Sequence, residues 1–167
     1  MDAAELRALQ APLKQRYQDD PASAQITLSA SGSLDSLSVA CRIDTGRALV
    51  EAGLHPATGG TGMQACSGDM FLEALVACAG VTLRAVATAL EIEIRSGTVR
   101  AEGDLDFRGT LGVSKQAPVG FRAIRLTFVL ETGASPEQLE RLLALTQRYC
   151  VVLQTLRMPP EVSVGWA

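Results

Sequence analysis

The fold is decided by the stretch Met70–Leu90, which reads MFLEALVACAGVTLRAVATAL and carries only Glu73 and Arg84 as charges. A helix that is apolar on nearly every face has to be buried. Two unpaired charges near its middle would each cost about 2 kcal/mol or more in a bilayer. A buried helix of a globular core therefore explains the stretch better than a membrane span.

The residues just before this stretch predict where the helix begins. Ser67 is a suitable N-cap, and the carboxylate of Asp69 in the first turn complements the helix dipole. We expect a long central helix over residues 67–91.

N-terminal to this helix, the spacing of apolar residues changes from helical to strand-like. Residues 1–20 show helical spacing, and Pro12 should kink or split that helix, so we expect a short peripheral helix there. Apolar and polar residues then alternate, as in strands, at Ile26, Leu28, Ala30, Leu37, Val39, Cys41 and Ile43. Two turn signals, Ser31-Gly32-Ser33 and Asp44-Thr45-Gly46, divide this part. Residues 25–52 are predicted to form an antiparallel meander.

C-terminal to the helix, residues 97–167 predict further strands and then helices. Strict alternation runs from Val99 to Phe107, and Phe121–Glu131 forms the strand paired to it. Ser135-Pro136-Glu137-Gln138 is a capping box with proline at the first helical position. Cys150–Arg157 either continues that helix or starts a new one, and a last strand follows at Val162, Val164 and Trp166. This order predicts a single α+β domain over residues 1–167 with a mostly antiparallel sheet.

Composition and charge exclude several classes of partner. The chain has 167 residues, 47% of them hydrophobic, and a net charge of −3 with scattered lysines and arginines. This distribution offers no basic patch for nucleic acid or an anionic membrane. No signal sequence opens the chain, since Met1-Asp2-Ala3-Ala4-Glu5 starts acidic, so a cytoplasmic location is expected.

The four cysteines do not have the spacing of a metal site. Cys41, Cys66, Cys78 and Cys150 form no C-x-x-C motif, and His55 is the only histidine. We therefore expect no metal and no cofactor. A cysteine hydrolase is also disfavoured, because His55 lies in a Gly/Pro/Thr loop without an orienting carboxylate beside it.

Two motifs in this order resemble the OsmC/Ohr superfamily of OsmC-like and organic hydroperoxide resistance proteins. The first is Leu72-Glu73-Ala74-Leu75-Val76-Ala77-Cys78, followed by Thr82-Leu83-Arg84. The second is Arg148-Tyr149-Cys150-Val151, followed by Thr155-Leu156. Glu102-Gly103-Asp104 and Pro118–Ile124 look like the family's paired strands between the motifs. The resemblance covers roughly Gly59 to the C terminus.

This resemblance implies a fold, an assembly and an activity. The chain should form an intertwined homodimer with two buried central helices and act in oxidative-stress defence. It should be a thiol-dependent peroxidase for organic hydroperoxides, with hydrogen peroxide as a second candidate substrate. Cys78 would be the peroxidatic residue and Cys150 the resolving one. A dithiol, lipoyl or thioredoxin-like, would return the electrons. The chemistry agrees, because a sulfenic acid condenses readily with a neighbouring thiol.

The resemblance also implies an activating arginine held by a carboxylate. Asp69 stands near the position of that carboxylate, with a first-turn acid as its ordinary role. Arg42 and Arg47, on the N-terminal strands, are the candidate cations, although a solvated strand position is the ordinary role of Arg42. Val151 replaces the proline that commonly follows the second cysteine, which leaves an extra backbone donor.

Two alternatives remain open from the sequence. Cys66 is an extra thiol that could compete with Cys150 as the resolving partner, whereas Cys41 is expected to be structural. The second alternative is a non-enzymatic OsmC-like protein that binds a hydrophobic small molecule at the dimer interface while the cysteines stay inert.

Overall fold

A computed structural model describes residues 2–19, 31–34, 40–44, 49–112 and 114–166 of the chain. These residues form two compact units. The helical unit comprises Met1–Asp20, Ala74–Arg100 and Thr127–Ala167, and the strand unit comprises Pro21–Glu73 and Ala101–Leu126. The central helix and the two longest strands contribute residues to both units. The elements are a mixture of helices and strands, so the α+β class is confirmed.

The first sheet lies in the strand unit and has the order β1-β2-β3-β4. Its strands are β1 (Ser31–Leu34), β2 (Ala40–Asp44), β3 (Leu49–Gly53) and β4 (Ala65–Cys66). The first three pair antiparallel, which confirms that part of the predicted meander. The short strand β4 pairs parallel to β3 and was not predicted, because two residues carry no alternation signal.

The predicted turn at Ser31–Ser33 is wrong. These residues belong to β1, where Gly32 lies opposite Ile43 and Leu34 opposite Cys41. Serine and glycine favour turns locally. Strand formation depends on the neighbouring strand, and here the backbone pairing with β2 outweighs the local preference. The strand expected before Ser31, at residues 25–30, lies outside the described residues.

The central helix α2 runs from Ser67 to Ala89, close to the predicted 67–91, with Asp69 in its first turn. One stripe of the helix is buried within the chain, made by Leu75, Ala79, Leu83 and Ala87. Spacing by four residues keeps these side chains on one face. Among the described residues, α2 is also the one helix with the length and composition to cross a membrane, a test that core helices of soluble proteins also pass.

The C-terminal end of α2 closes in a Schellman motif. The Ile92 N–H donates to the Ala87 carbonyl at 2.9 Å, and the Glu91 N–H donates to the Thr88 carbonyl at 3.1 Å. Glu91 takes the left-handed position at φ 58°, where glycine is usual. Ile92 and Ala87 are both part of the buried core. The hydrogen bond that ends the helix therefore lies between two residues of that core.

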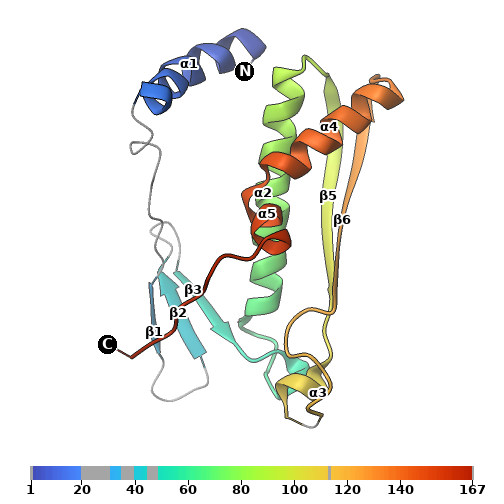
Figure 1. Cartoon of the computed structure of the whole chain (residues 1–167). Helices are drawn as coiled ribbons and strands as arrows, with labels where there is room; N and C mark the ends of the chain where they lie inside the picture. Colours follow the sequence, from blue (N-terminus) through green and yellow to red (C-terminus); the bar gives the residue numbers. More distant parts are fainter. Residues whose placement is uncertain (1, 20–30, 35–39, 45–48, 113, 167) are drawn as a thin grey trace. The chain divides into compact units, whose positions relative to one another are not determined.

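The second sheet consists of β5 (Ile94–Asp104) and β6 (Ala123–Thr132), which confirms the predicted pairing. In the helical unit, α2 runs beside these two strands (Figure 1). A buried cluster forms there, with Leu83, Ala87, Ile92 and Leu142 at its centre and Val86, Phe128 and Leu130 among the residues packed against it. Gly97 allows the close approach, since a Cβ atom there would lie 2.7 Å from Leu130 Cδ2.

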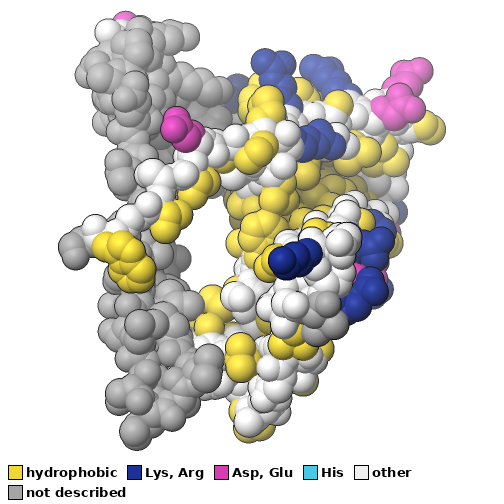
Figure 2. Space-filling model, turned by 60° about the horizontal axis from the view of Figure 1, so that its bottom comes forward, with side chains coloured by type: hydrophobic (Ala, Val, Ile, Leu, Met, Phe, Trp, Pro, Cys, Tyr) yellow, Lys and Arg dark blue, Asp and Glu magenta, His cyan; other side chains and the backbone are white. Residues whose placement is uncertain are grey.

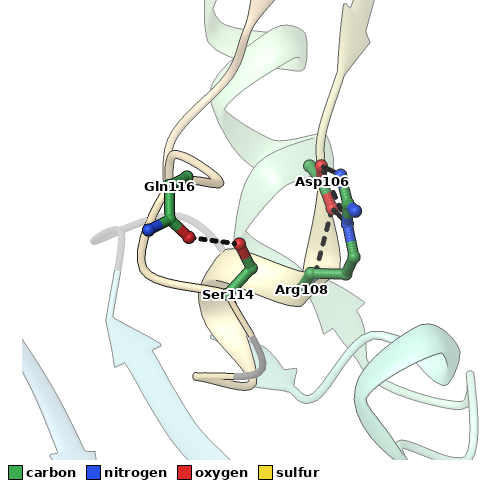
Figure 3. Close-up of polar contacts among 4 residues, drawn as sticks. All are labelled: Asp106, Arg108, Ser114 and Gln116. Atoms are coloured by element: carbon green, nitrogen blue, oxygen red, sulfur yellow. Dashed lines mark hydrogen bonds and ion pairs between the residues drawn. The ribbon is translucent and has the colours of Figure 1, made fainter.

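The alternation from Val99 to Phe107 predicts a strand that extends further toward the C terminus than β5 does. β5 ends at Asp104, and Phe107 begins the short helix α3 (Phe107–Thr110). Asp106 ends the alternation because its side chain caps α3, accepting a hydrogen bond from the Arg108 N–H, and it also pairs with the Arg108 guanidinium (Figure 3). The Arg108 side chain lowers the pKa of Asp106 to about 2.

The loop before β4 contains the 3-10 helix η2 (Pro56–Thr58), which His55 caps. His55 Nδ1 accepts the Ala57 N–H at 3.0 Å, and its ring stacks on Phe107 at 4.8 Å between centroids. The only histidine in the sequence therefore has a structural role in this loop.

The C-terminal part contains α4 (Pro136–Tyr149) and α5 (Val151–Arg157). The capping box of Ser135 and Gln138 is present as predicted. The last strand expected at Val162, Val164 and Trp166 is not formed, and these side chains are fully or largely exposed. A strand needs a neighbour for its backbone groups, and none pairs with this segment among the described residues.

The N-terminal helix α1 runs without interruption from Ala3 to Asp19, so Pro12 does not split it. Proline removes only one backbone donor from such a helix. Arg7 of α1 pairs with Glu91 at 3.5 Å, with both side chains largely exposed.

The conformation of Glu91 predicts a stabilising substitution. Glu91→Gly should raise the free energy of unfolding by about 0.5–1 kcal/mol, because glycine adopts a positive φ without steric cost. Chemical denaturation would measure it. Glu91→Ala is the matched control, because it also removes the exposed pair with Arg7 but keeps a Cβ atom in the left-handed region. Equal stabilities of the two variants would contradict the explanation.

Candidate active site: the Cys78 and Cys150 pair

Cys78 and Cys150 are 72 positions apart in the sequence and meet in the helical unit. Cys78 lies in the middle of α2 and is half-buried, whereas Cys150 lies between α4 and α5 with 0% of its surface exposed. Each thiol shifts the pKa of the other, and both are free. The structure thus brings together the two cysteines that the sequence analysis paired.

Cys150 is positioned by the break between two helices. Its backbone is extended, with φ −72° and ψ 105°, so it ends α4 and precedes α5. Its N–H donates to the Thr146 carbonyl at 3.0 Å, and its carbonyl accepts from the Gln154 N–H at 2.9 Å. The Cys150 side chain makes no capping hydrogen bond to α5.

The beginning of α5 and the next turn of α2 affect the acidity of Cys78. Hydrogen bonding from the Val152 and Val151 backbone contributes to lowering the pKa of Cys78. The Thr82 hydroxyl, one turn further along α2, acts in the same direction and donates to the Cys78 carbonyl at 2.7 Å.

These donors give the two thiols opposite acidities. Burial raises the pKa of Cys78, but the hydrogen bonds from Val152, Cys150 and Val151 outweigh it, and the pKa is lowered below its ordinary value. Burial raises the pKa of Cys150, and the neighbouring Cys78 raises it further. Cys78 is therefore the more acidic thiol of the pair.

The other predicted site residues lie elsewhere or outside the description. Asp69 is exposed in the first turn of α2, nine positions before Cys78 or about two and a half helical turns. Arg42 lies in β2 opposite Ser33 and Glu51, with its side chain outside the described part, and Arg47 falls among residues that are not described. Cys66 lies half-buried in β4, in the strand unit.

The donors from Val151 and Val152 were not assigned to Cys78 from the sequence. The signal was present in part, because Val151 was noted as a residue with a free N–H where proline is common. A further signal is the absence of serine, threonine, aspartate or asparagine at the start of α5.

A metal centre is not formed by the described side chains, since no three histidine, cysteine, aspartate or glutamate residues among them are placed to hold an ion. The arrangement that stands out is instead a more acidic thiol next to a less acidic one. Such a pair can undergo reversible two-electron oxidation to a disulfide.

Solved structures share this fold at low sequence identity. An OsmC-like protein from Mycoplasma pneumoniae matches with a TM-score of 0.67 and 16% identity, over 81% of this chain and 90% of that one. An organic hydroperoxide resistance protein OsmC from Legionella pneumophila matches with a TM-score of 0.62 and 17% identity, over 80% and 93%. One from Elizabethkingia anophelis, with thiocyanate bound, matches with a TM-score of 0.64 and 18% identity, over 81% and 91%.

The sequence itself matches no curated protein. It does match the family model described as OsmC-like protein, over residues 60–165, which include both cysteines of the pair. Because this match covers more than half of the chain, the protein belongs to the OsmC-like family, within the OsmC/Ohr superfamily.

Proposed function

We propose that the protein is a thiol-dependent peroxidase that reduces organic hydroperoxides, with Cys78 as the peroxidatic residue and Cys150 as the resolving residue. The observation that carries this proposal is the pairing of two distant thiols whose pKa values are displaced in opposite directions. Such a difference divides the roles, because one thiol attacks as an anion while the other stays protonated. Relatives described as organic hydroperoxide resistance proteins support the choice of substrate.

The proposed reaction has two steps in the protein. The Cys78 thiolate attacks one oxygen of the hydroperoxide, the O–O bond breaks, and the alkoxide takes a proton and leaves as an alcohol. Cys78 is then a sulfenic acid. The Cys150 sulfur attacks the Cys78 sulfur as it loses its proton, and the hydroxyl leaves as water, so a disulfide forms. A dithiol, lipoyl or thioredoxin-like, returns two electrons and two protons.

The surroundings of the two sulfurs support this order of events. Cys78 is half-buried and can be reached by a small substrate, whereas Cys150 has no exposed surface. Val81, three positions after Cys78 on the same side of α2, is 73% exposed and offers an apolar contact next to the thiol. An alkyl or acyl hydroperoxide suits such a site better than a charged substrate.

The remaining parts of the proposal concern an activating arginine and the cellular location of the protein. Arg42 or Arg47, held by Asp69, would add a cation beside the main-chain donors of Cys78. The protein would act in the cytoplasm in defence against oxidative stress, without nucleic acid or membrane partners. The alternative, a binding protein with inert cysteines, becomes the better account if the variants below leave peroxide consumption unchanged.

Replacement of the two cysteines should separate their roles. Cys78→Ser should abolish peroxide consumption under a dithiol, whereas Cys150→Ser should keep the first attack but stop disulfide formation. Organic hydroperoxide consumption and peptide mapping of the oxidised chain would measure both. Cys66→Ser serves as the control and should retain the Cys78–Cys150 disulfide. A disulfide between Cys66 and Cys78 in the wild type would instead give the resolving role to Cys66.

Removal of one main-chain donor should weaken the nucleophile without unfolding the protein. Val151→Pro deletes the N–H at the first helical position, where proline is well tolerated, and the extended Cys150 before it is compatible with proline. Loss of a hydrogen bond to a charged sulfur should slow alkylation of Cys78 about tenfold at neutral pH. Because the pKa of Cys78 rises in this variant, the alkylation profile should move to higher pH.

Val151→Ala is the control for this variant, because it shortens the same side chain but keeps the N–H. Its alkylation profile against pH should match that of the wild type. A shift of equal size in Val151→Ala and Val151→Pro would assign the effect to packing rather than to the donor.

We also propose a homodimer, because α2 is apolar on nearly every face and only one stripe of it is buried within its own chain. Figure 2 shows hydrophobic side chains exposed over a broad part of the surface. Large exposed apolar areas mark interaction surfaces, and a second copy is the occupant that the family resemblance implies. Light scattering at micromolar concentration should give twice the chain mass of 17.6 kDa. A folded monomer would contradict the proposal.

A further inference from the structure

A cavity of about 600 Å³ lies in the helical unit, where α2 ends and the chain turns into β5. The first residues of α1 complete its lining, so every lining residue belongs to the same unit. Neither Cys78 nor Cys150 is among them. Ligand pockets in proteins commonly have volumes of about 300–1,000 Å³. The cavity therefore has the size of a small-molecule site and is not part of the thiol pair.

The least exposed residues of the cavity are apolar. Ala87 and Ile92 belong to the buried core, and the Ile92 N–H donates to the Ala87 carbonyl at 2.9 Å. The half-buried side chains of Ile94 and Ala3 extend this lining into β5 and α1. An aliphatic group that contacts these residues leaves water, and this transfer favours its binding.

Three of the charged side chains in the cavity already have partners in the chain. Arg7 of α1 and Glu91 beyond the end of α2 form an ion pair at 3.5 Å. The Asp2 carboxylate accepts the Glu5 N–H at 2.8 Å at the start of α1. These contacts cap α1 and connect it to the rest of the unit. The charged side chains that remain for a ligand are Arg84 and Glu93.

Arg84 and Glu93 line the same cavity without being paired to each other. The Arg84 guanidinium donates to the Ile94 carbonyl at 3.1 Å, which holds one of its nitrogens in place and leaves further N–H groups as donors. No hydrogen bond or ion pair joins the Glu93 carboxylate to another residue in the part of the chain that the structure describes. Neither residue takes part in the proposed peroxidase reaction.

The balance of charges selects the kind of ligand. Three carboxylates and two guanidinium groups line the cavity, which leaves an excess of one negative charge. A simple anion would be repelled by this excess, and a simple cation would leave Arg84 without a ligand partner. A ligand that carries both charges can pair with Arg84 and with Glu93.

We propose that this cavity binds a small aliphatic zwitterion of the amino-acid type, with its carboxylate on Arg84, its ammonium on Glu93 and its side chain on the apolar lining. Arginine pairs with carboxylates through two parallel hydrogen bonds. Both charged side chains are exposed, and exposed ion pairs are weak, so the dissociation constant should be about millimolar. The site does not use the thiol pair, so the inference is independent of the proposed function.

NMR titration of the full chain with L-leucine tests the proposal. The amide signals of Ile92 and Ile94 should shift and saturate as leucine fills the cavity. Two analogues separate the charged groups of leucine, because isocaproate lacks the ammonium and isoamylamine lacks the carboxylate. Each analogue should bind about fivefold to tenfold more weakly than leucine, since it loses one hydrogen-bonded charge pair.

Two variants assign the two charges to their side chains. Glu93→Gln should weaken leucine binding by a similar factor but should not weaken isocaproate binding, because isocaproate has no ammonium to pair. Arg84→Met should weaken leucine binding but not isoamylamine binding. A substitution that only disturbed the fold would weaken every probe. Glu140→Gln and Arg141→Met, which are exposed on α4 outside the cavity, are the matched controls and should leave leucine binding unchanged.

The contrary outcomes are equally specific. Absent or non-saturating shifts of the Ile92 and Ile94 amides would overturn the site. Isoamylamine that bound as tightly as leucine would overturn the zwitterion in favour of a cation, and isocaproate that did so would overturn it in favour of an anion. A protein that lacks peroxidase activity but binds leucine in this way would refute the proposed function and leave this inference standing.

Discussion

The helical unit depends on the burial of Cys150, which has 0% of its surface exposed at the break between α4 and α5. Its extended backbone ends α4, and its N–H donates to the Thr146 carbonyl at 3.0 Å. Cys78 of α2 is its neighbour, since each thiol shifts the pKa of the other. The break between the two C-terminal helices therefore sets the point where the two thiols meet.

The surroundings of the two cysteines make them chemically different. Burial raises the pKa of both thiols. At Cys78, hydrogen bonding from Val152, Cys150 and Val151 outweighs burial and lowers the pKa. At Cys150, the neighbouring Cys78 adds to the effect of burial and raises the pKa. The difference in acidity therefore comes from the two environments rather than from the residue type.

Much of this structure could be predicted from the sequence where the signal was local. The apolar run of α2, the capping box at Ser135 and the alternation in β5 and β6 each identified their elements. Predictions failed where a neighbour decided the outcome. Ser31–Ser33 joined a strand because β2 lies beside it, and Asp106 ended a strand because it caps α3. The pairing of Cys78 with Cys150 came from the family resemblance, whereas the donors of α5 required the packing of two helices.

The position of Cys78 on α2 connects its chemistry to the apolar surface of the helix. The stripe formed by Leu75, Ala79 and Leu83 faces the core, while Cys78 lies one position away from it and Val81 lies further round, largely exposed. A second copy that covered Val81 would also exclude water from the side of Cys78. Exclusion of water strengthens every hydrogen bond to the thiolate and, at the same time, raises its pKa by desolvation. Fixed backbone donors are well suited to that situation, because they cannot rotate away from the sulfur and need no reorganisation as charge moves onto the peroxide oxygen.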